Sequence, residues 1–131
     1  LICNLIEEIG LDSEPYQIAD GSGLSLYNYV TPELLVSLLN YALSKPEIYQ
    51  HLYPALPIAG VDGTLSNRMQ DTPAYNNVHA KTGTVTGISS LAGYLTASNG
   101  HILSFCIINQ GISSGRLGRD FQNEVCNALC Q

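Results

Sequence analysis

Apolar residues recur at helical spacing in two segments in the first third of the chain. Residues 1–9 place Leu and Ile on one side of a helix, and Gly10 follows as a C-terminal cap. Residues 31–45 give the clearest pattern, with Thr31 as N-cap, Pro32 in the first turn, and leucines every three to four residues. We predict two helices, and we expect the second to pack on a sheet.

Farther along, residues 78–85, 89–98 and 101–111 have the composition of strands. The last two are separated by Asn99-Gly100, a dipeptide typical of a tight hairpin turn. After them helical spacing returns, with one apolar stripe made of Leu117, Phe121, Val125, Ala128 and Leu129. This order predicts an α+β fold in which an antiparallel sheet is flanked by helices.

Two connecting segments separate these elements. Residues 11–23 are rich in turn formers, and we expect a short strand there that ends at Asp20-Gly21. Residues 47–77 lack sustained periodicity and contain several Pro and Gly, so we expect short helical turns and surface loops. Loops of that length usually contribute to a binding or catalytic site.

Composition and charge argue against certain classes of partner. The chain has 131 residues, enough for one domain with a real core, and carries 5 Lys and Arg against 11 Asp and Glu, a net charge of −6. This balance argues against nucleic acid and anionic membranes as partners. The sequence has no apolar run that could span a bilayer, so we predict no transmembrane segment.

The four cysteines and three histidines do not form a metal-binding pattern. The cysteines lack a CxxC pair or a His at zinc spacing, and we predict neither a metal nor another cofactor. Cys126 and Cys130 are four residues apart on a predicted helix, where a disulfide is awkward, so buried free thiols are the favoured interpretation. The histidines are interpreted as incidental.

The tripeptide Lys81-Thr82-Gly83 carries the candidate chemistry. Strand alternation sends Lys81 and Thr82 to opposite faces, so both can serve one ligand only if it lies along the edge of the strand. A peptide could bind there as an added strand, and Gly83 would let it approach closely. The alternative is that Lys81 only prevents edge-to-edge aggregation and that the glycines mark a bulge.

Further blocks favour the first interpretation. The blocks "DGSGLSLYNYVTPELL", "LPIAGVDGTLSNR", "HAKTGT" and "SSLAGY" occur in the order found in penicillin-binding D-alanyl-D-alanine carboxypeptidases of the DacB type, which the chain resembles from about residue 5 to residue 111. The resemblance implies the C-terminal portion of a serine β-lactamase or penicillin-binding-protein-like transpeptidase fold. The Ser-x-x-Lys and Ser-x-Asn motifs of that family are absent. We therefore expect residues 1–131 to be a piece of a longer catalytic domain whose nucleophile lies upstream.

The resemblance also implies roles for the motif residues. Lys81 would lie beside the nucleophile and join the proton relay, and Thr82 and Thr84 would bind the terminal carboxylate of the substrate. The N–H of Thr84 would be one donor of the oxyanion hole. We assign Lys81 and Thr84 as catalytic, and the substrate-binding residues as Lys81, Thr82, Gly83 and Thr84.

Two further residues leave alternatives open. Ser22 lies between two glycines, but G-x-S-x-G is not met, so a structural turn is favoured over a nucleophile. Arg68 is either a buried anchor, which we favour, or a contact to substrate.

By resemblance, the expected function is part of a serine D-Ala-D-Ala carboxypeptidase, or also an endopeptidase, that trims peptidoglycan stem peptides and binds β-lactams. The fragment alone is expected to be inactive. The alternatives are a β-lactamase on the same fold and a catalytically dead cell-wall binding module. The resemblance implies a periplasmic or cell-envelope location, and the oligomeric state stays open.

Overall fold

The computed structural model describes residues 2–131. Three strands form one antiparallel sheet in the order β1-β2-β3. The elements are α1 (Ile2–Glu8), α2 (Pro32–Ser44), α3 (Pro46–Leu52), η1 (Tyr53–Ala55), η2 (Gly63–Leu65), β1 (His79–Val85), β2 (Ile88–Thr96), β3 (Ile102–Gln110) and α4 (Gly115–Leu129). The predicted α+β fold is confirmed, and Leu1, assigned to the first predicted helix, lies outside the described residues.

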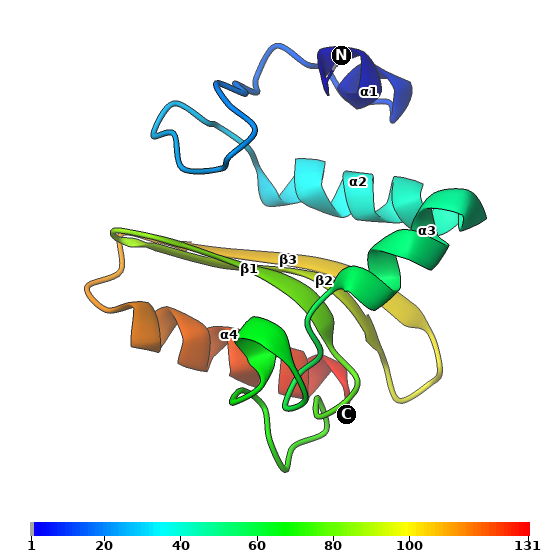
Figure 1. The fold of residues 1–131 in the computed structure, drawn as a ribbon, viewed down its shortest axis with the longest axis vertical. Coiled ribbons are helices and arrows are strands. Elements are labelled where there is room, and N and C mark those ends of the chain that lie inside the picture. The colour runs from blue at the N-terminus through cyan, green and yellow to red at the C-terminus, as the bar shows by residue number, and fades with distance from the viewer. Residues whose placement is uncertain (1) are drawn as a thin grey trace.

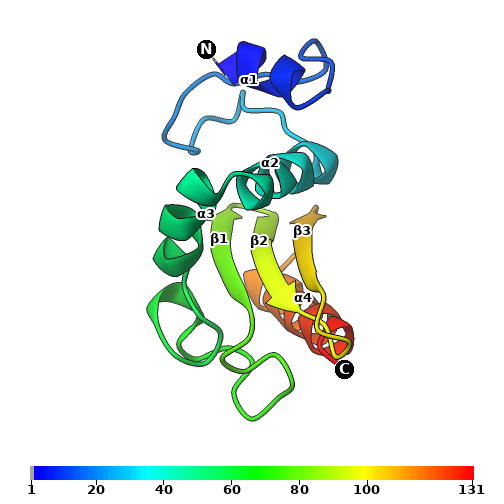
Figure 2. The same cartoon turned by 90° about the vertical axis from the view of Figure 1, so that its right-hand side faces the viewer.

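The molecule is layered. Helix α2 covers one face of the sheet and α4 covers the other, while α1 lies on the far side of α2 (Figure 1). The view turned by 90° shows α3 and the loop after it running beside β1 (Figure 2). Hydrogen bonds tie this loop to the strand, because Ala80 donates its N–H to the carbonyl of Pro57 at 2.9 Å. The loop thus closes the outer edge of β1 at its beginning.

Both hairpins turn at a glycine with positive φ. Gly87 (φ +75°) joins β1 to β2, and Gly100 (φ +83°) lies in the turn between β2 and β3, which confirms the predicted Asn99-Gly100 hairpin. Across the first pair, Thr82 faces Leu91 and Thr84 faces Ser89. This register places two serines of β2, Ser89 and Ser90, beside the end of the Lys-Thr-Gly segment.

Helix α2 follows the prediction closely. Thr31 caps it, since the side-chain oxygen of Thr31 accepts the N–H of Leu34 at 3.2 Å. Leu34 and Ala42 are buried, and the Tyr94 hydroxyl of β2 donates to the carbonyl of Leu39 at 2.7 Å. Helix α2 therefore buries apolar side chains and is joined to β2 by a side-chain hydrogen bond.

Helix α4 packs over the other face, and residues of its apolar stripe are exposed rather than turned to the sheet. Leu117 is 60% exposed and Phe121 is 52% exposed, whereas the buried residues of the helix are Gly118, Gln122 and Cys126. Gly118 permits the close approach, because a Cβ there would come within 3.0 Å of the Ser89 side chain. Gly118, Gln122 and Cys126, rather than the apolar stripe, are the residues that α4 buries, and Cys126 belongs to the hydrophobic core.

The short helical turns and loops predicted for residues 47–77 are confirmed, whereas residues 11–23 contain less strand than predicted. The expected short strand before Asp20 is a single bridge between Gln17 and Tyr29.

All four cysteines are free, and burial raises the pKa of the Cys126 thiol to about 12, but Cys3 is exposed. Within residues 2–131, no helix is long and apolar enough to cross a membrane, and no cluster of three or more His, Cys, Asp or Glu could hold a metal.

Candidate active site at the outer edge of β1

The Lys-Thr-Gly segment lies on a strand at the end of the sheet, as the alternation argument predicts. The N–H of Ala80 points away from β2, toward the loop. Because backbone direction repeats every two residues in an antiparallel strand, Thr82 and Thr84 also direct their N–H and C=O groups to this outer edge. A ligand lying along the edge would meet those groups first.

Lys81 reaches the same edge from the opposite face. Its side chain is exposed, and its Nζ donates a hydrogen bond to the carbonyl oxygen of Thr82. Since that carbonyl points outward, the ammonium group is held at the edge of the strand. The structure thus brings the charge of Lys81 beside the backbone of Thr82, although the two side chains start on different faces.

Gly83 lies where the first two strands approach closely. A Cβ at this position would be 2.5 Å from the Ser90 hydroxyl, which donates to the Gly83 carbonyl at 3.4 Å. Any larger residue would force the Ser90 side chain to rotate. The glycine therefore fits a close approach between strands.

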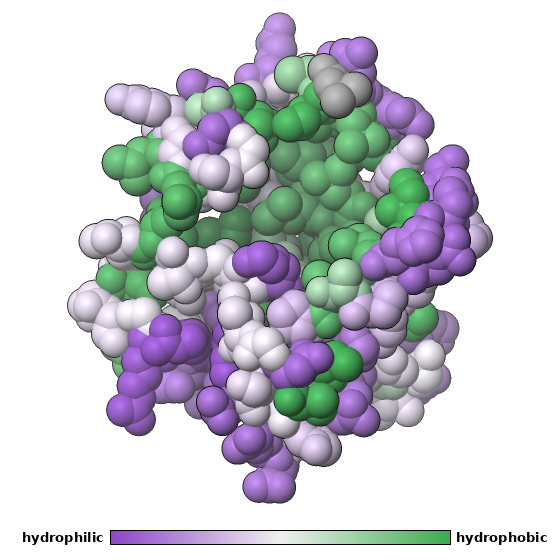
Figure 3. Space-filling model, viewed as in Figure 1, coloured by the Kyte–Doolittle hydropathy of each residue, from purple (hydrophilic) through white to green (hydrophobic). Residues whose placement is uncertain are grey.

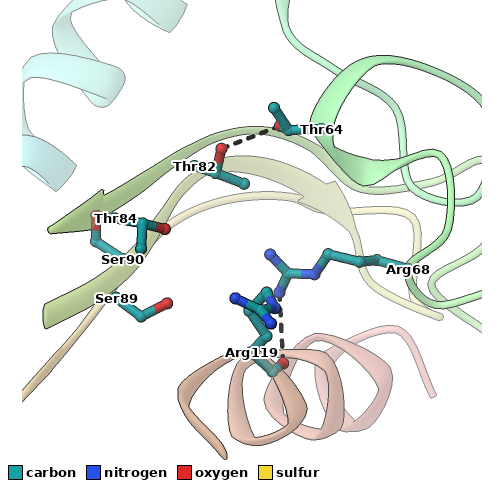
Figure 4. Close-up of a pocket in the computed structure, with 7 residues that line it drawn as sticks. All are labelled: Thr64, Arg68, Thr82, Thr84, Ser89, Ser90 and Arg119. Carbon is teal, nitrogen blue, oxygen red and sulfur yellow. Dashed lines mark hydrogen bonds between the residues drawn. The ribbon is translucent and has the colours of Figure 1, made fainter. Parts of the chain in front are cut away.

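A cavity of about 180 Å³ lies between β1 and α4 (Figure 4). Five hydroxyl residues and two arginines line it, namely Thr64, Arg68, Thr82, Thr84, Ser89, Ser90 and Arg119. The Thr82 hydroxyl donates to the Thr64 hydroxyl at 3.0 Å, which links β1 to η2. The side chains of Thr82 and Thr84 therefore line a polar cavity.

Arg68 lines this cavity and is held in place by hydrogen bonds to α4. Its side chain is 8% exposed, and its Nε and Nη2 donate to the Asn123 Oδ1 at 2.9 and 2.8 Å. Its Nη2 also donates to the Gln122 Oε1 at 3.0 Å, and the Gln122 amide donates to the Ser89 Oγ at 3.1 Å and the Asn109 Oδ1 at 2.9 Å. The structure confirms the anchor interpretation of Arg68, which also borders the cavity.

A second, larger hollow of about 560 Å³ lies on the α2 side, between the loop of residues 18–30 and the ends of the strands. Gly83 and Thr84 form part of its wall. Figure 3 shows apolar side chains gathered between α1 and the sheet, where the surface is hollowed. The adjoining loop exposes large apolar groups, Leu26 at 81% and Leu24 at 72%. Apolar surface of this kind is typical of an interface.

Ser22 lies in that loop and forms a turn, as favoured. Its hydroxyl donates to the Asp20 carboxylate at 2.8 Å and accepts the Leu24 N–H at 3.2 Å. Hydrogen bonds from Asn28 and then Ser22 lower the pKa of Asp20. Both hydrogen bonds of the Ser22 hydroxyl stay within the loop, so this serine stabilises the turn.

Sequence reasoning missed the residues that α4 and η2 supply, Arg119, Gln122 and Thr64. A signal for α4 existed, because Gly118, Gln122 and Cys126 recur every four residues and could have marked a second face. For Thr64, the sequence separation of 18 residues from Thr82 left no such signal.

Comparison with known proteins assigns the sequence of the chain to one family. The sequence profile of the D-Ala-D-Ala carboxypeptidase 3 (S13) family matches residues 2–130. The D-alanyl-D-alanine carboxypeptidase DacB of Haemophilus influenzae is 44% identical over 102 residues, covering 76% of this chain and 21% of that protein. A D-alanyl-D-alanine carboxypeptidase of Actinomadura sp. is 44% identical over 110 residues, covering 80% and 20%. The chain thus spans about a fifth of the length of these relatives.

Solved structures agree. The crystal structure of penicillin binding protein 4 (dacB) from Haemophilus influenzae superposes with a TM-score of 0.80 at 34% identity, over 96% of this chain and 31% of that one. The TLA-1 extended spectrum β-lactamase, with a TM-score of 0.64 and 18% identity over 97% of this chain and 50% of that one, shares the fold. The chain belongs to the D-Ala-D-Ala carboxypeptidase 3 (S13) family.

Proposed function

We propose that residues 1–131 are the C-terminal part of the catalytic domain of a longer serine-type D-Ala-D-Ala carboxypeptidase. The observation that carries the proposal is the outer edge of β1, where the backbone of Thr82 and Thr84 and the ammonium of Lys81 converge. The nucleophilic serine would come from the part of the protein that lies outside this sequence. The parent would act as a hydrolase on peptidoglycan stem peptides.

The edge of β1 suits a peptide substrate. A stem peptide laid alongside would exchange backbone hydrogen bonds with Thr82 and Thr84, as an added strand does. The glycine between them leaves the edge free of a side chain. The substrate would end with its carboxylate near the Thr82 and Thr84 hydroxyls, which line the cavity on the α4 side.

The chemistry is acyl transfer. The serine oxygen attacks the carbonyl carbon of the penultimate D-Ala, the peptide bond to the terminal D-Ala breaks, and the amine of that D-Ala leaves with a proton. The N–H of Thr84 would donate to the developing oxyanion, a contribution of about 3 kcal/mol for one such donor. Lys81 would lend positive potential and assist proton transfer. Water then hydrolyses the acyl-enzyme and releases the shortened peptide.

Three observations support a longer parent. The relatives are about five times longer than the matched region, the loop of residues 18–30 exposes apolar side chains, and the apolar hollow opens onto Gly83 and Thr84. An upstream segment packed in this hollow would bring a serine to the edge of β1 and complete the opposite wall of the site.

The same family relationship supports the partners and location that we propose. A crystal structure of the Haemophilus influenzae penicillin binding protein 4 contains a bound β-lactam. We propose that β-lactams acylate the parent of this chain at the same serine. Because its substrate would be cell-wall peptide, the parent would work in the periplasm or elsewhere in the cell envelope.

Penicillin labelling followed by intact-mass spectrometry tests the proposal. The longer protein should gain one penicilloyl group on a serine outside residues 1–131, with slow release, whereas the 131-residue chain should gain none. Rapid steady turnover of penicillin would favour a β-lactamase instead. An adduct on Ser22 or Ser25 of the short chain would contradict the assignment of the nucleophile to another segment.

A further inference from the structure

The loop after α3 occupies the first part of the outer edge of β1. Ile58 forms an antiparallel bridge with His79, and the Ala80 N–H donates to the Pro57 carbonyl at 2.9 Å. Figure 2 shows this loop running beside the strand. Within residues 2–131, no backbone group bonds to the outer side of Thr82. The edge is therefore closed up to residue 80 and open from residue 81 to residue 84.

Pro57 ends the paired part of this edge. In an antiparallel ladder the residue opposite Ala80 would both accept and donate a backbone hydrogen bond, but proline has no N–H. Leu56 keeps extended backbone angles, with φ −79° and ψ 137°, and before it the chain turns into η1. A ligand strand laid along the open part would therefore meet Leu56 and Pro57 at its end.

Several contacts hold the loop in place. The Asp62 Oδ1 accepts the N–H of Ile58 at 2.7 Å, and Ala59 is completely buried in the hydrophobic core. Gly63 lies so close to Pro57 that a Cβ on the glycine would be 3.1 Å from the proline ring. Displacing the loop would break a hydrogen bond and uncover apolar surface, so the loop resists a ligand that pushes against it.

The proposed function decides which end of a peptide meets the loop. There the carbonyl of the cleaved bond faces the Thr84 N–H and the peptide ends toward Thr82, so the peptide runs antiparallel to β1. The residues after the cleaved bond then face Gly83 and Thr82. In the register of the loop, Leu56 already takes the next position, opposite Lys81. The open edge thus has room for a peptide only as far as Thr82.

We propose that residues 56–58 form a stop that limits a linear peptide to the two positions after the cleaved bond, and that Asp62 is the positioning residue that holds this stop. The inference deepens the proposed function and rests on it. A longer linear leaving group has to bend away from the edge or displace the loop, which weakens its binding in the transition state. The stop therefore favours removal of a terminal residue over cleavage within a linear peptide.

Peptides of increasing length test the stop in the longer protein. The substrates are N-acetyl-Lys-D-Ala peptides extended by D-Ala, D-Ala-Gly or D-Ala-Gly-Gly, all amidated so that the terminal charge does not change along the series. For cleavage after the first D-Ala, kcat/KM should fall about tenfold or more when the third residue is added, and less when the second is added. Mass spectrometry of the released leaving group identifies the bond that is cleaved. An equal kcat/KM for the last two peptides would overturn the stop.

Two substitutions of one residue test how the stop is held. Asp62→Ala removes the acceptor of the Ile58 N–H, so it should reduce the penalty on the third residue several-fold, whereas Asp62→Asn keeps an Oδ1 acceptor and should retain the penalty. The control is Asp12→Ala, which removes another loop carboxylate that accepts a backbone N–H, from Glu14, and should retain the penalty. Equal penalties in Asp62→Ala and Asp62→Asn would overturn the role of Asp62.

Hydrogen exchange of the 131-residue chain tests the closed edge without catalysis. The N–H of Ala80 should exchange about tenfold or more slowly than the outward N–H groups of Thr82 and Thr84, and Asp62→Ala should speed its exchange. Equal exchange at Ala80 and Thr82 would overturn the stop, even where the longer protein cleaves peptides ending in D-Ala-D-Ala, and it decides the question where no amidated peptide is cleaved. Slow exchange at Ala80 in a protein that does not cleave D-Ala-D-Ala would instead refute the proposed reaction and leave the closed edge standing.

Discussion

Helices α2 and α4 cover opposite faces of the same three strands, yet they are attached in different ways (Figure 1). Helix α2 buries the apolar side chains of Leu34 and Ala42, and its Leu39 carbonyl accepts one hydrogen bond from the Tyr94 hydroxyl of the sheet. Helix α4 packs through Gly118 and the amide of Gln122, and turns Phe121 outward. One side-chain hydrogen bond joins α2 to the sheet, whereas α4 combines a hydrogen-bonded network with a place for Cys126 in the hydrophobic core.

The difference follows the position of the cavity that Thr82 and Thr84 line. Gln122 connects Arg68 to Ser89, and Ser89 is the register partner of Thr84. A polar network has directional bonds, so it fixes the relative positions of helix, loop and strand more tightly than an apolar contact does. The α4 face thus holds the floor of the cavity, while α2 serves as scaffold.

The largest expected effect belongs to a residue that lies on neither helix. In the longer protein, Lys81→Ala should slow acylation by penicillin about a thousandfold or more, because the positive charge at the edge of β1 is lost, while the melting temperature stays nearly constant. Stopped-flow acylation and thermal denaturation measure the two quantities. The control is Lys45→Ala at the C-terminal end of α2, which should acylate normally. A large fall in melting temperature with normal acylation would mean that Lys81 acts in packing.

The buried face of α2 should respond to the loss of volume. Leu34 is 2% exposed, so Leu34→Ala should lower the free energy of unfolding by about 3 kcal/mol, as cavity-forming substitutions do. Leu34→Met, which keeps volume, should cost less than about 1.5 kcal/mol. Chemical denaturation of the 131-residue chain measures both. Equal costs for the two variants would show that the stability of the chain does not depend on packing at Leu34.

The network at α4 should respond to the loss of hydrogen bonds at constant volume. Gln122 is fully buried, so Gln122→Leu should lower the free energy of unfolding by about 2 kcal/mol, because Arg68 and Ser89 lose a partner. The exposed neighbour gives the control Glu124→Leu, with an expected change within about 0.5 kcal/mol. A neutral or stabilising Gln122→Leu would mean that the network does not support the fold.

These two helices also explain what the sequence could and could not predict. Helix α2 was predicted with its cap and its buried face, because its buried residues are apolar and the 3.6-residue repeat reports them directly. Helix α4 was predicted as an element, but the apolar stripe that predicted it includes exposed residues such as Leu117 and Phe121. Its true contact uses Gly118 and Gln122, which a hydrophobicity pattern does not count. The apolar stripe of a helix therefore does not always mark the face that packs on the sheet.

The candidate site also has one part that could be predicted from the sequence and one part that could not. The position of Lys81 at the edge of a strand followed from alternation and a local motif, and the structure bears out the edge. The cavity beneath Thr82 depends on residues 18 to 37 positions away in the chain, from Thr64 on one side to Arg119 on the other. Such contacts arise only when the layers are assembled, so one sequence without the fold could not predict them.

A pH effect should arise at the beginning of β1. Burial is the main cause that lowers the pKa of His79, whose ring stacks on Tyr53 with centroids 4.1 Å apart. Between that lowered pKa and about 6.5 the unfolded chain binds more protons than the folded one, so stability should fall on acidification below about pH 6.5. His79→Phe keeps an aromatic ring and should reduce this slope. The exposed His101 provides the control His101→Phe, and unfolding curves between pH 5 and 8, roughly the range in which His titrates, measure both. A slope that survives His79→Phe would assign it to another group.

The smallest expected effect tests the face of α4 directly. If the apolar stripe were buried, Phe121→Ala would lower the free energy of unfolding of the 131-residue chain by about 3–5 kcal/mol. Since Phe121 is 52% exposed, the expected loss is below about 1 kcal/mol, well under that of Leu34→Ala on the opposite face. Urea denaturation of both variants under one set of conditions gives the comparison, with m-values checked for constancy. Equal losses at the two positions would mean that α4 turns its apolar stripe to the sheet in solution, and the contrast between the two helices would then be lost.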